Sequence, residues 1–180
     1  MEEELRAVSR PAVTIACDID GVIAPVDLAP AGCVELPRVM YDTHVLTRAV
    51  AALKRWHALG ARVLWHSTWR EPYTDELATT LTLPGFGTFA SEEEFLLEDD
   101  SNTWWKLRAV QRWLREAPQD NSALLVWIDD DIADAIEQGE IDRATLEDPR
   151  LVVVSPTTQA GLTISEIEVV TSAAVSNMHC

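Results

Sequence analysis

The chain has 180 residues, of which 47% are hydrophobic and 24% are charged, and this composition predicts one folded domain over residues 1–180. Its 30 acidic and 14 basic residues give a formal net charge of −16, which disfavours extended nucleic acid binding because such proteins neutralise phosphates with basic patches. The acidic first residues, and apolar runs much shorter than the ~20 residues that span a bilayer, argue against a membrane partner and predict a cytoplasmic protein.

The predicted elements alternate between strand and helix along the chain. Short apolar runs rich in β-branched residues predict strands at 12–17, 61–66, 85–90, 123–128 and 151–154. Apolar residues at helical spacing, bounded by caps and stop signals, predict helices at 44–59, 72–83 and 103–116, a short helix after 131, and a last helix from the capping box at 163–166. The Pro-containing stretch at 21–42 predicts a loop, and we expect flexible ends at about 1–10 and 176–180.

This alternation predicts an α/β fold with three layers, a Rossmann-like domain in which helices cover both faces of a central parallel sheet. Neither the stretch from Gly21 to Gly60 nor the one between Ser67 and Lys106 has room for a folded lid beside its predicted elements. We therefore expect no separate cap domain. The three cysteines form no CxxC pair, so we expect free thiols rather than disulfides or a zinc site.

Polar residues follow three of the predicted strands at their carboxyl ends, which is where parallel sheets bind ligands. Asp18 and Asp20 follow the first strand, Ser67 follows the second, and Asp129 and Asp130 follow the strand at 123–128. Four carboxylates in one crevice need a counter-charge, and oxygen ligands without His or Cys suit a hard cation such as Mg²⁺. The sequence therefore predicts that these four acids form a magnesium site.

Magnesium keeps open coordination positions, and a phosphorylated substrate would fill them. Ser67 can donate a hydrogen bond to a phosphate oxygen, and Lys106, at the start of its predicted helix, can bring a positive charge to the same group. Asp18, the last residue in line with its strand, is the better candidate for a nucleophile that attacks phosphorus. Asp20 then suits the role of general acid and base.

This set of residues resembles the haloacid dehalogenase-like (HAD) phosphohydrolases. The matching pieces stand in the family's order and cover roughly residues 12–154: Asp18-Ile-Asp20-Gly21-Val22, Ser67, Lys106 and Asp129-Asp130. The resemblance implies that Asp18 forms an aspartyl-phosphate. It also implies that Asp20 is the general acid and base and gives its backbone carbonyl to Mg²⁺. The presence of an Asp at position 20 argues against dehalogenase chemistry, because the dehalogenases of this family lack it.

The resemblance further implies that Ser67 and Lys106 hold the phosphate and that Asp129 with Asp130 completes the metal site. The Trp-rich surroundings of these motifs are similar to a smaller branch of the family that includes domains of RNA repair proteins: Trp65-x-Ser67-x-Trp69, Trp105-Lys106 and Trp127-Ile-Asp-Asp. That branch usually carries Thr where Ser67 stands, and Ser67 keeps the hydroxyl.

Several residues near these motifs allow two interpretations. Asp131 and Asp134 are interpreted as acids at the start of a helix, favoured by its dipole, and are left outside the site. Trp69 and Trp104 either pack in the core, which we favour, or stack on a base or another flat leaving group. Arg70 either steers a phosphate or pairs with an acid beside it.

The leading hypothesis is a Mg²⁺-dependent phosphomonoesterase whose substrate is a phosphorylated small molecule or an oligonucleotide end. One alternative is a phospho-acceptor signalling module, which also combines acids, a hydroxyl, a Lys and Mg²⁺ on a parallel sheet. In such modules the Lys comes last, whereas here Lys106 precedes Asp129. The other alternative is a non-catalytic interaction domain on the same fold. The sequence does not specify an oligomeric state.

Overall fold

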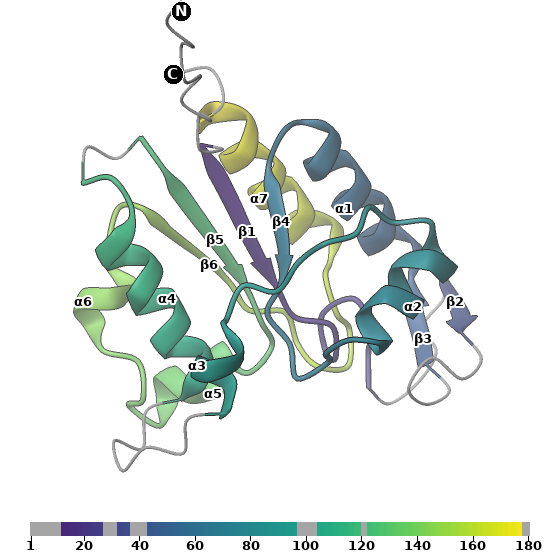
Figure 1. Ribbon diagram of the computed structural model, residues 1–180, viewed down its shortest axis with the longest axis horizontal. Helices are drawn as coiled ribbons and strands as arrows, with labels where there is room; N and C mark the ends of the chain where they lie inside the picture. The colour runs from purple at the N-terminus through teal and green to yellow at the C-terminus, as the bar shows by residue number, and fades with distance from the viewer. Residues whose placement is uncertain (1–11, 27–31, 37–42, 97–103, 120–121, 178–180) are drawn as a thin grey trace, which may run out of the picture.

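The computed structural model describes residues 12–26, 32–36, 43–96, 104–119 and 122–177. Its centre is a four-stranded parallel sheet (Figure 1) with the order β4 (Arg62–Trp65), β1 (Val13–Cys17), β5 (Leu124–Ile128) and β6 (Leu151–Val154). The four strands confirm the predicted parallel sheet. Residues 1–10 and 178–180 of the ends predicted to be flexible, and part of the predicted loop at 21–42, lie outside the described residues, whereas 176–177 of the predicted flexible end belong to the last helix.

Helices cover both faces of this sheet because each buried strand is apolar on both sides. Alternate residues of a strand point to opposite faces: Ile15 and Val126 belong to one core, whereas Ala16 and Trp127 belong to the other. The first core is closed by α1 (Thr47–Ala58), α2 (Tyr73–Leu81) and α7 (Ile164–Asn177), and the second by α4 (Trp105–Glu116) and α5 (Ile132–Glu137). The sheet and its two helical coverings are the three predicted layers. Two further short helices among the described residues are α3 (Glu92–Leu96) and α6 (Arg143–Leu146).

The start of the first predicted helix is wrong. Residues Thr43–Leu46 form a strand, β3, which pairs antiparallel with β2 (Cys33–Leu36) inside the stretch predicted as a loop. The backbone NH of Leu46 donates to the carbonyl of Ile23, and the NH of Thr47 donates to the carbonyl of Gly32. These tertiary hydrogen bonds hold the segment extended although its apolar spacing is helical, and α1 begins only at Thr47.

The predicted strand at 85–90 is reduced to an isolated bridge between Trp65 and Thr88. The NH of Trp65 donates to the carbonyl of Gly87, and the NH of Phe89 donates to the carbonyl of Trp65. Gly85 and Gly87 offer no side chains to pack against a neighbouring strand, which explains why the pairing stops there.

The other predicted elements are confirmed to within a few residues. At the start of α7, the Thr163 NH donates to Glu166 Oε2 at 2.8 Å and the Glu166 NH donates to Thr163 Oγ1 at 3.3 Å, so the capping box is present. A lid could be inserted between β1 and α1 or between β4 and α4. Among the described residues, the first stretch forms only β2 and β3 and the second only α2 and α3, and neither holds a folded lid. None of the described helices is both long and apolar enough to cross a membrane.

Candidate active site

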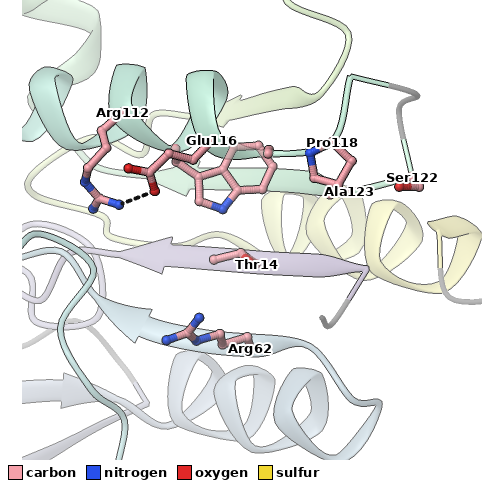
Figure 2. Close-up of a pocket in the computed structure, with 9 residues that line it drawn as sticks. Thr14, Arg62, Arg112, Glu116, Pro118, Ser122 and Ala123 are labelled. Carbon is pink, nitrogen blue, oxygen red and sulfur yellow. Dashed lines mark hydrogen bonds and ion pairs between the residues drawn. The ribbon is translucent and has the colours of Figure 1, made fainter. Parts of the chain in front are cut away.

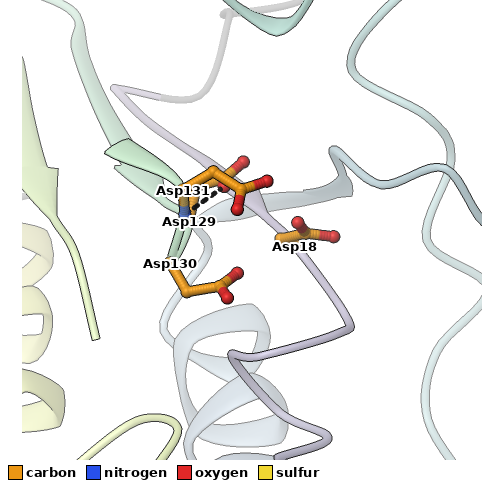
Figure 3. A group of neighbouring side chains, drawn as sticks. All are labelled: Asp18, Asp129, Asp130 and Asp131. Atoms are coloured by element: carbon orange, nitrogen blue, oxygen red, sulfur yellow. Dashed lines mark hydrogen bonds between the residues drawn. The ribbon is translucent and has the colours of Figure 1, made fainter. Parts of the chain in front are cut away.

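The parallel sheet brings the acids after β1 and β5 side by side. The Asp18 NH donates to the carbonyl of Ile128 at 2.9 Å, and the Asp129 NH donates to the carbonyl of Val154 at 3.1 Å. Ladder hydrogen bonds therefore continue one residue beyond each strand and fix both backbones. Figure 3 shows the resulting group, in which the side chain of Asp18 lies across from those of Asp129, Asp130 and Asp131.

Lys106 lies between two of these carboxylates. It is at the second position of α4, and its ammonium forms an ion pair with Asp18 Oδ2 and a second one with Asp129 Oδ2 at 2.6 Å. All three residues are buried, with exposed fractions of 3% for Lys106, 5% for Asp18 and 0% for Asp129. The start of α4 and the ends of β1 and β5 thus lie together in the interior, where the Lys106 ammonium contacts both carboxylates.

The charges of this group do not balance. Burial lowers the pKa of Lys106, but Asp18 and Asp129 raise it more, so the amine stays protonated. Burial raises the pKa of Asp18, against the attraction of Lys106. Burial and the charge of Asp18 raise the pKa of Asp129 to about 8, because one ammonium cannot neutralise two buried carboxylates. A further positive charge is needed for both acids to be ionised.

Asp130 and Asp131 enlarge the excess of negative charge. One ligand oxygen from each of Asp18, Asp129, Asp130 and Asp131 lies within 4.8 Å of the others. Burial also raises the pKa of Asp130. The presence of Asp131 in the cluster is a correction, since it was interpreted as a helix-start acid only. Its NH donates to Asp129 Oδ1 at 3.1 Å, a tight turn that folds the third acid of the run back toward the first two.

Gly21 makes room for the Asp130 side chain. Its φ is +66°, and a Cβ placed on it would lie 2.0 Å from Asp130 Oδ2. Any other residue at position 21 would therefore meet a carboxylate of the cluster. The glycine that follows Asp20 in the sequence motif is thus explained by close approach as well as by the turn.

The Asp20 carboxylate is not one of the four in the acidic cluster and accepts a hydrogen bond from an indole. Trp69 Nε1 donates to Asp20 Oδ2 at 2.8 Å, and Trp69 itself is only 1% exposed. Trp69 therefore packs in the core, as favoured, and the alternative that it stacks on a base is wrong. Sequence reasoning missed the contact with Asp20, because nothing in the spacing of the two residues indicates it.

Ser67 lies beside the nucleophile candidate. It is buried, its hydroxyl hydrogen-bonds the Asp18 carboxylate, and Ser67 Oγ accepts from the NH of Trp69 at 3.3 Å. The short segment after β4 thus reaches Asp18 through Ser67 and Asp20 through Trp69. The predicted neighbours Asp18, Ser67 and Lys106 are together in the structure.

An aromatic cluster fixes the start of α4, from which Lys106 projects. His66 Nε2 lies 3.1 Å from the Lys106 carbonyl oxygen, and the His66 ring packs edge to face against Phe89 and Trp105. Burial and the charge of Lys106 lower the pKa of His66 to about 3, so the imidazole is neutral near pH 7. Trp104 is half-buried and packs on Trp127, with ring centroids 5.3 Å apart.

A cavity of about 230 Å³ lies away from the acids (Figure 2). Its lining includes Thr14 near the start of β1, Arg62 at the start of β4, and Arg112 and Glu116 on α4. In a parallel sheet the starts of the strands lie opposite their carboxyl ends. The cavity is therefore at the other end of the sheet from the carboxylates.

The parallel sheet, the acids after β1 and β5, and Lys106 at the start of α4 together define a HAD-type phosphohydrolase fold. The profile of the family described as HAD domain in Swiss Army Knife RNA repair proteins matches residues 14–167 of the chain. The chain belongs to this family, and the resemblance noted in its motifs is confirmed. No curated protein and no solved structure gives a significant match.

The ion group predicts opposite effects for its positive and negative members when metal is chelated. Lys106→Met should lower the free energy of unfolding by about 3–5 kcal/mol, because it leaves two buried carboxylates without a counter-charge. Asp129→Asn should leave it unchanged or higher, because the amide oxygen can still accept from Asp131 and the variant replaces a carboxyl whose ionised form burial and Asp18 already disfavour. Urea unfolding with EDTA measures both. A loss for Asp129→Asn as large as that for Lys106→Met would contradict the excess of negative charge.

Proposed function

We propose that the protein is a Mg²⁺-dependent phosphomonoester hydrolase that works through an aspartyl-phosphate on Asp18. The observation that carries this proposal is the buried ammonium of Lys106 shared by Asp18 and Asp129 at the centre of a larger carboxylate cluster. A hydrolytic site needs a fixed nucleophile, positive charge for the phosphoryl oxygens and a proton carrier. The family to which the chain belongs supports the same class of reaction.

The donor set of the cluster fits magnesium. It offers carboxylate oxygens only, without His or Cys, and its excess negative charge calls for a hard cation. Asp18, Asp129 and Asp130 would hold the ion, with Asp131 beside them and the backbone carbonyl of Asp20 as a further oxygen. When bound, magnesium would neutralise charge on the transferred phosphoryl group.

Asp18 is restrained on both of its oxygens. Oδ1 accepts from the Ile19 NH at 2.6 Å, and Oδ2 is paired with Lys106. In the first step an Asp18 oxygen forms a bond to phosphorus while the bond from phosphorus to the leaving oxygen breaks. Lys106 and the Ser67 hydroxyl would hold the phosphoryl oxygens in place of their contacts with Asp18.

Asp20 completes the proton balance. It would give a proton to the leaving oxygen in the first step and take one from the water that attacks phosphorus in the second. That second attack breaks the bond to Asp18 and releases inorganic phosphate and the free carboxylate. Trp69 holds Oδ2 of Asp20, so the other oxygen, Oδ1, is the one that would carry the proton.

The fold around the site supports the substrate class that we propose. The described residues place no folded lid over the carboxyl ends of β1 and β5, so we propose a phosphate on a nucleotide or an oligonucleotide end rather than an enclosed small substrate. Only the end of a polymer would be bound, because the net charge of −16 opposes a long nucleic acid. We further propose one cytoplasmic domain over residues 1–180.

Asp18→Asn should reduce turnover of p-nitrophenyl phosphate with Mg²⁺ by at least about a thousandfold, because an amide cannot attack phosphorus. Asp134→Asn is the matched control: it removes an exposed acid on α5, outside the cluster, and should keep full activity. Phosphate release measures both. Full activity of Asp18→Asn would exclude the proposed mechanism, and stable phosphorylation of the wild type without turnover would indicate a phospho-acceptor module instead.

Trp69→Phe should slow hydrolysis of alkyl phosphates by about tenfold, in line with the loss of a hydrogen bond to a charged group. The effect on p-nitrophenyl phosphate should be smaller, because its leaving group needs less help from a proton donor. Trp56→Phe is the matched control, since Trp56 is also buried and also donates an indole hydrogen bond, at 2.9 Å to Thr171. Equal losses on both substrates would show that Trp69 does not act through Asp20.

A further inference from the structure

Two NH groups of the Arg70 guanidinium lack polar partners among the residues that the structure describes. It follows Trp69 directly, and its Cζ lies 4.1 Å from the centroid of the Phe95 ring and 5.5 Å from that of Trp105. Its Nε and Nη2 are buried, and within the described part of the chain they have no hydrogen-bond partner. Glu92 acts on Arg70 electrostatically, but within the described part of the chain no acid forms an ion pair with it.

The aromatic rings compensate this charge only in part. Contact with a ring face is favourable for a guanidinium, but buried NH groups without an acceptor cost free energy. Burial accordingly lowers the pKa of Arg70, against the attraction of Glu92. The side chain is half-buried rather than enclosed, so its remaining edge can meet a ligand. An anion there would supply the missing counter-charge.

The position of Arg70 connects it to the proposed active site. Trp69, its neighbour in sequence, holds Asp20, the proposed proton donor to the leaving group. Trp105, its partner in stacking, directly precedes Lys106, whose ammonium reaches Asp18. Arg70 therefore neighbours, along the chain or through a ring contact, the residue that holds Asp20 and the residue that precedes Lys106.

We propose that Arg70 is a specificity-determining residue that binds a second anionic group, such as a phosphate, carried by the leaving group of the substrate. The inference rests on the proposed phosphomonoesterase function and deepens it. Phe95 and Trp105 hold the guanidinium plane, so that it is oriented before the substrate arrives. A phosphate ester with a neutral leaving group would not use this contact.

The first test compares substrates of the wild-type protein. We expect kcat/KM for adenosine 3′,5′-bisphosphate to exceed that for adenosine 3′-monophosphate and for adenosine 5′-monophosphate by at least about tenfold. Arg70→Met should reduce this preference to nearly one, and Arg70→Lys should retain part of it. On p-nitrophenyl phosphate, Arg70→Met should change kcat/KM by less than about threefold. Arg55→Met, at an exposed position of α1, removes the same charge and should change nothing.

The second test measures binding without turnover. In an Asp18→Asn background, Arg70→Met should weaken binding of the bisphosphate by about tenfold and that of the monophosphates much less. No wild-type preference for the bisphosphate, or an equal loss on all substrates in Arg70→Met, would overturn the role of Arg70. Failure of the wild type to hydrolyse even p-nitrophenyl phosphate would overturn the proposed hydrolase function instead, and the binding comparison would still decide whether Arg70 selects a second anion.

Discussion

A buried ammonium held between two buried carboxylates is the interaction on which the rest of the site depends. Lys106 is delivered by α4, Asp18 by β1 and Asp129 by β5, so the ion group exists only if the parallel sheet and the helix layer above it are both in place. A buried ion group is costly unless its charges are compensated. We therefore expect this arrangement to lower the free energy of unfolding, a cost that the proposed chemistry requires. In the function that we propose, a cation compensates its excess negative charge, and Asp18 is the group that a phosphoryl donor would meet.

The segment after β4 joins this ion group to the remainder of the site. Within four residues it presents Ser67 to Asp18, Trp69 to Asp20, and Arg70 to the Phe95 ring. The turn that makes these contacts is anchored from both sides: the His66 NH donates to the carbonyl of Cys17, and the His66 ring packs against Trp105, the residue before Lys106. Displacement of this turn would therefore disturb the proposed nucleophile, proton carrier and substrate contact together.

Most of the fold and the centre of the site could be predicted from the sequence, because both depend on local signals. Apolar β-branched runs specified the four parallel strands, and parallel strands bring Asp18, Ser67 and Asp129 to one edge whatever the details of packing. The errors arose where tertiary hydrogen bonds decide. The β2–β3 pair overrides a helical pattern, Asp131 joins the cluster through a backbone turn to Asp129, and Trp69 reaches Asp20 across 49 residues of sequence. Contacts between residues so far apart produce no periodic pattern in the sequence from which they could be predicted.

The central claim is that the ion group holds Asp18 as a nucleophile that becomes phosphorylated. The most direct measurement is an acid quench of the wild-type protein during turnover of a ³²P-labelled substrate with Mg²⁺, followed by peptide mapping of the label. The account predicts a label on the peptide that contains Asp18, with the lability of an acyl phosphate, and its loss in Asp18→Asn. Two results would contradict it: phosphate release during a single turnover with no protein-bound label at any quench time, or a label on Ser67.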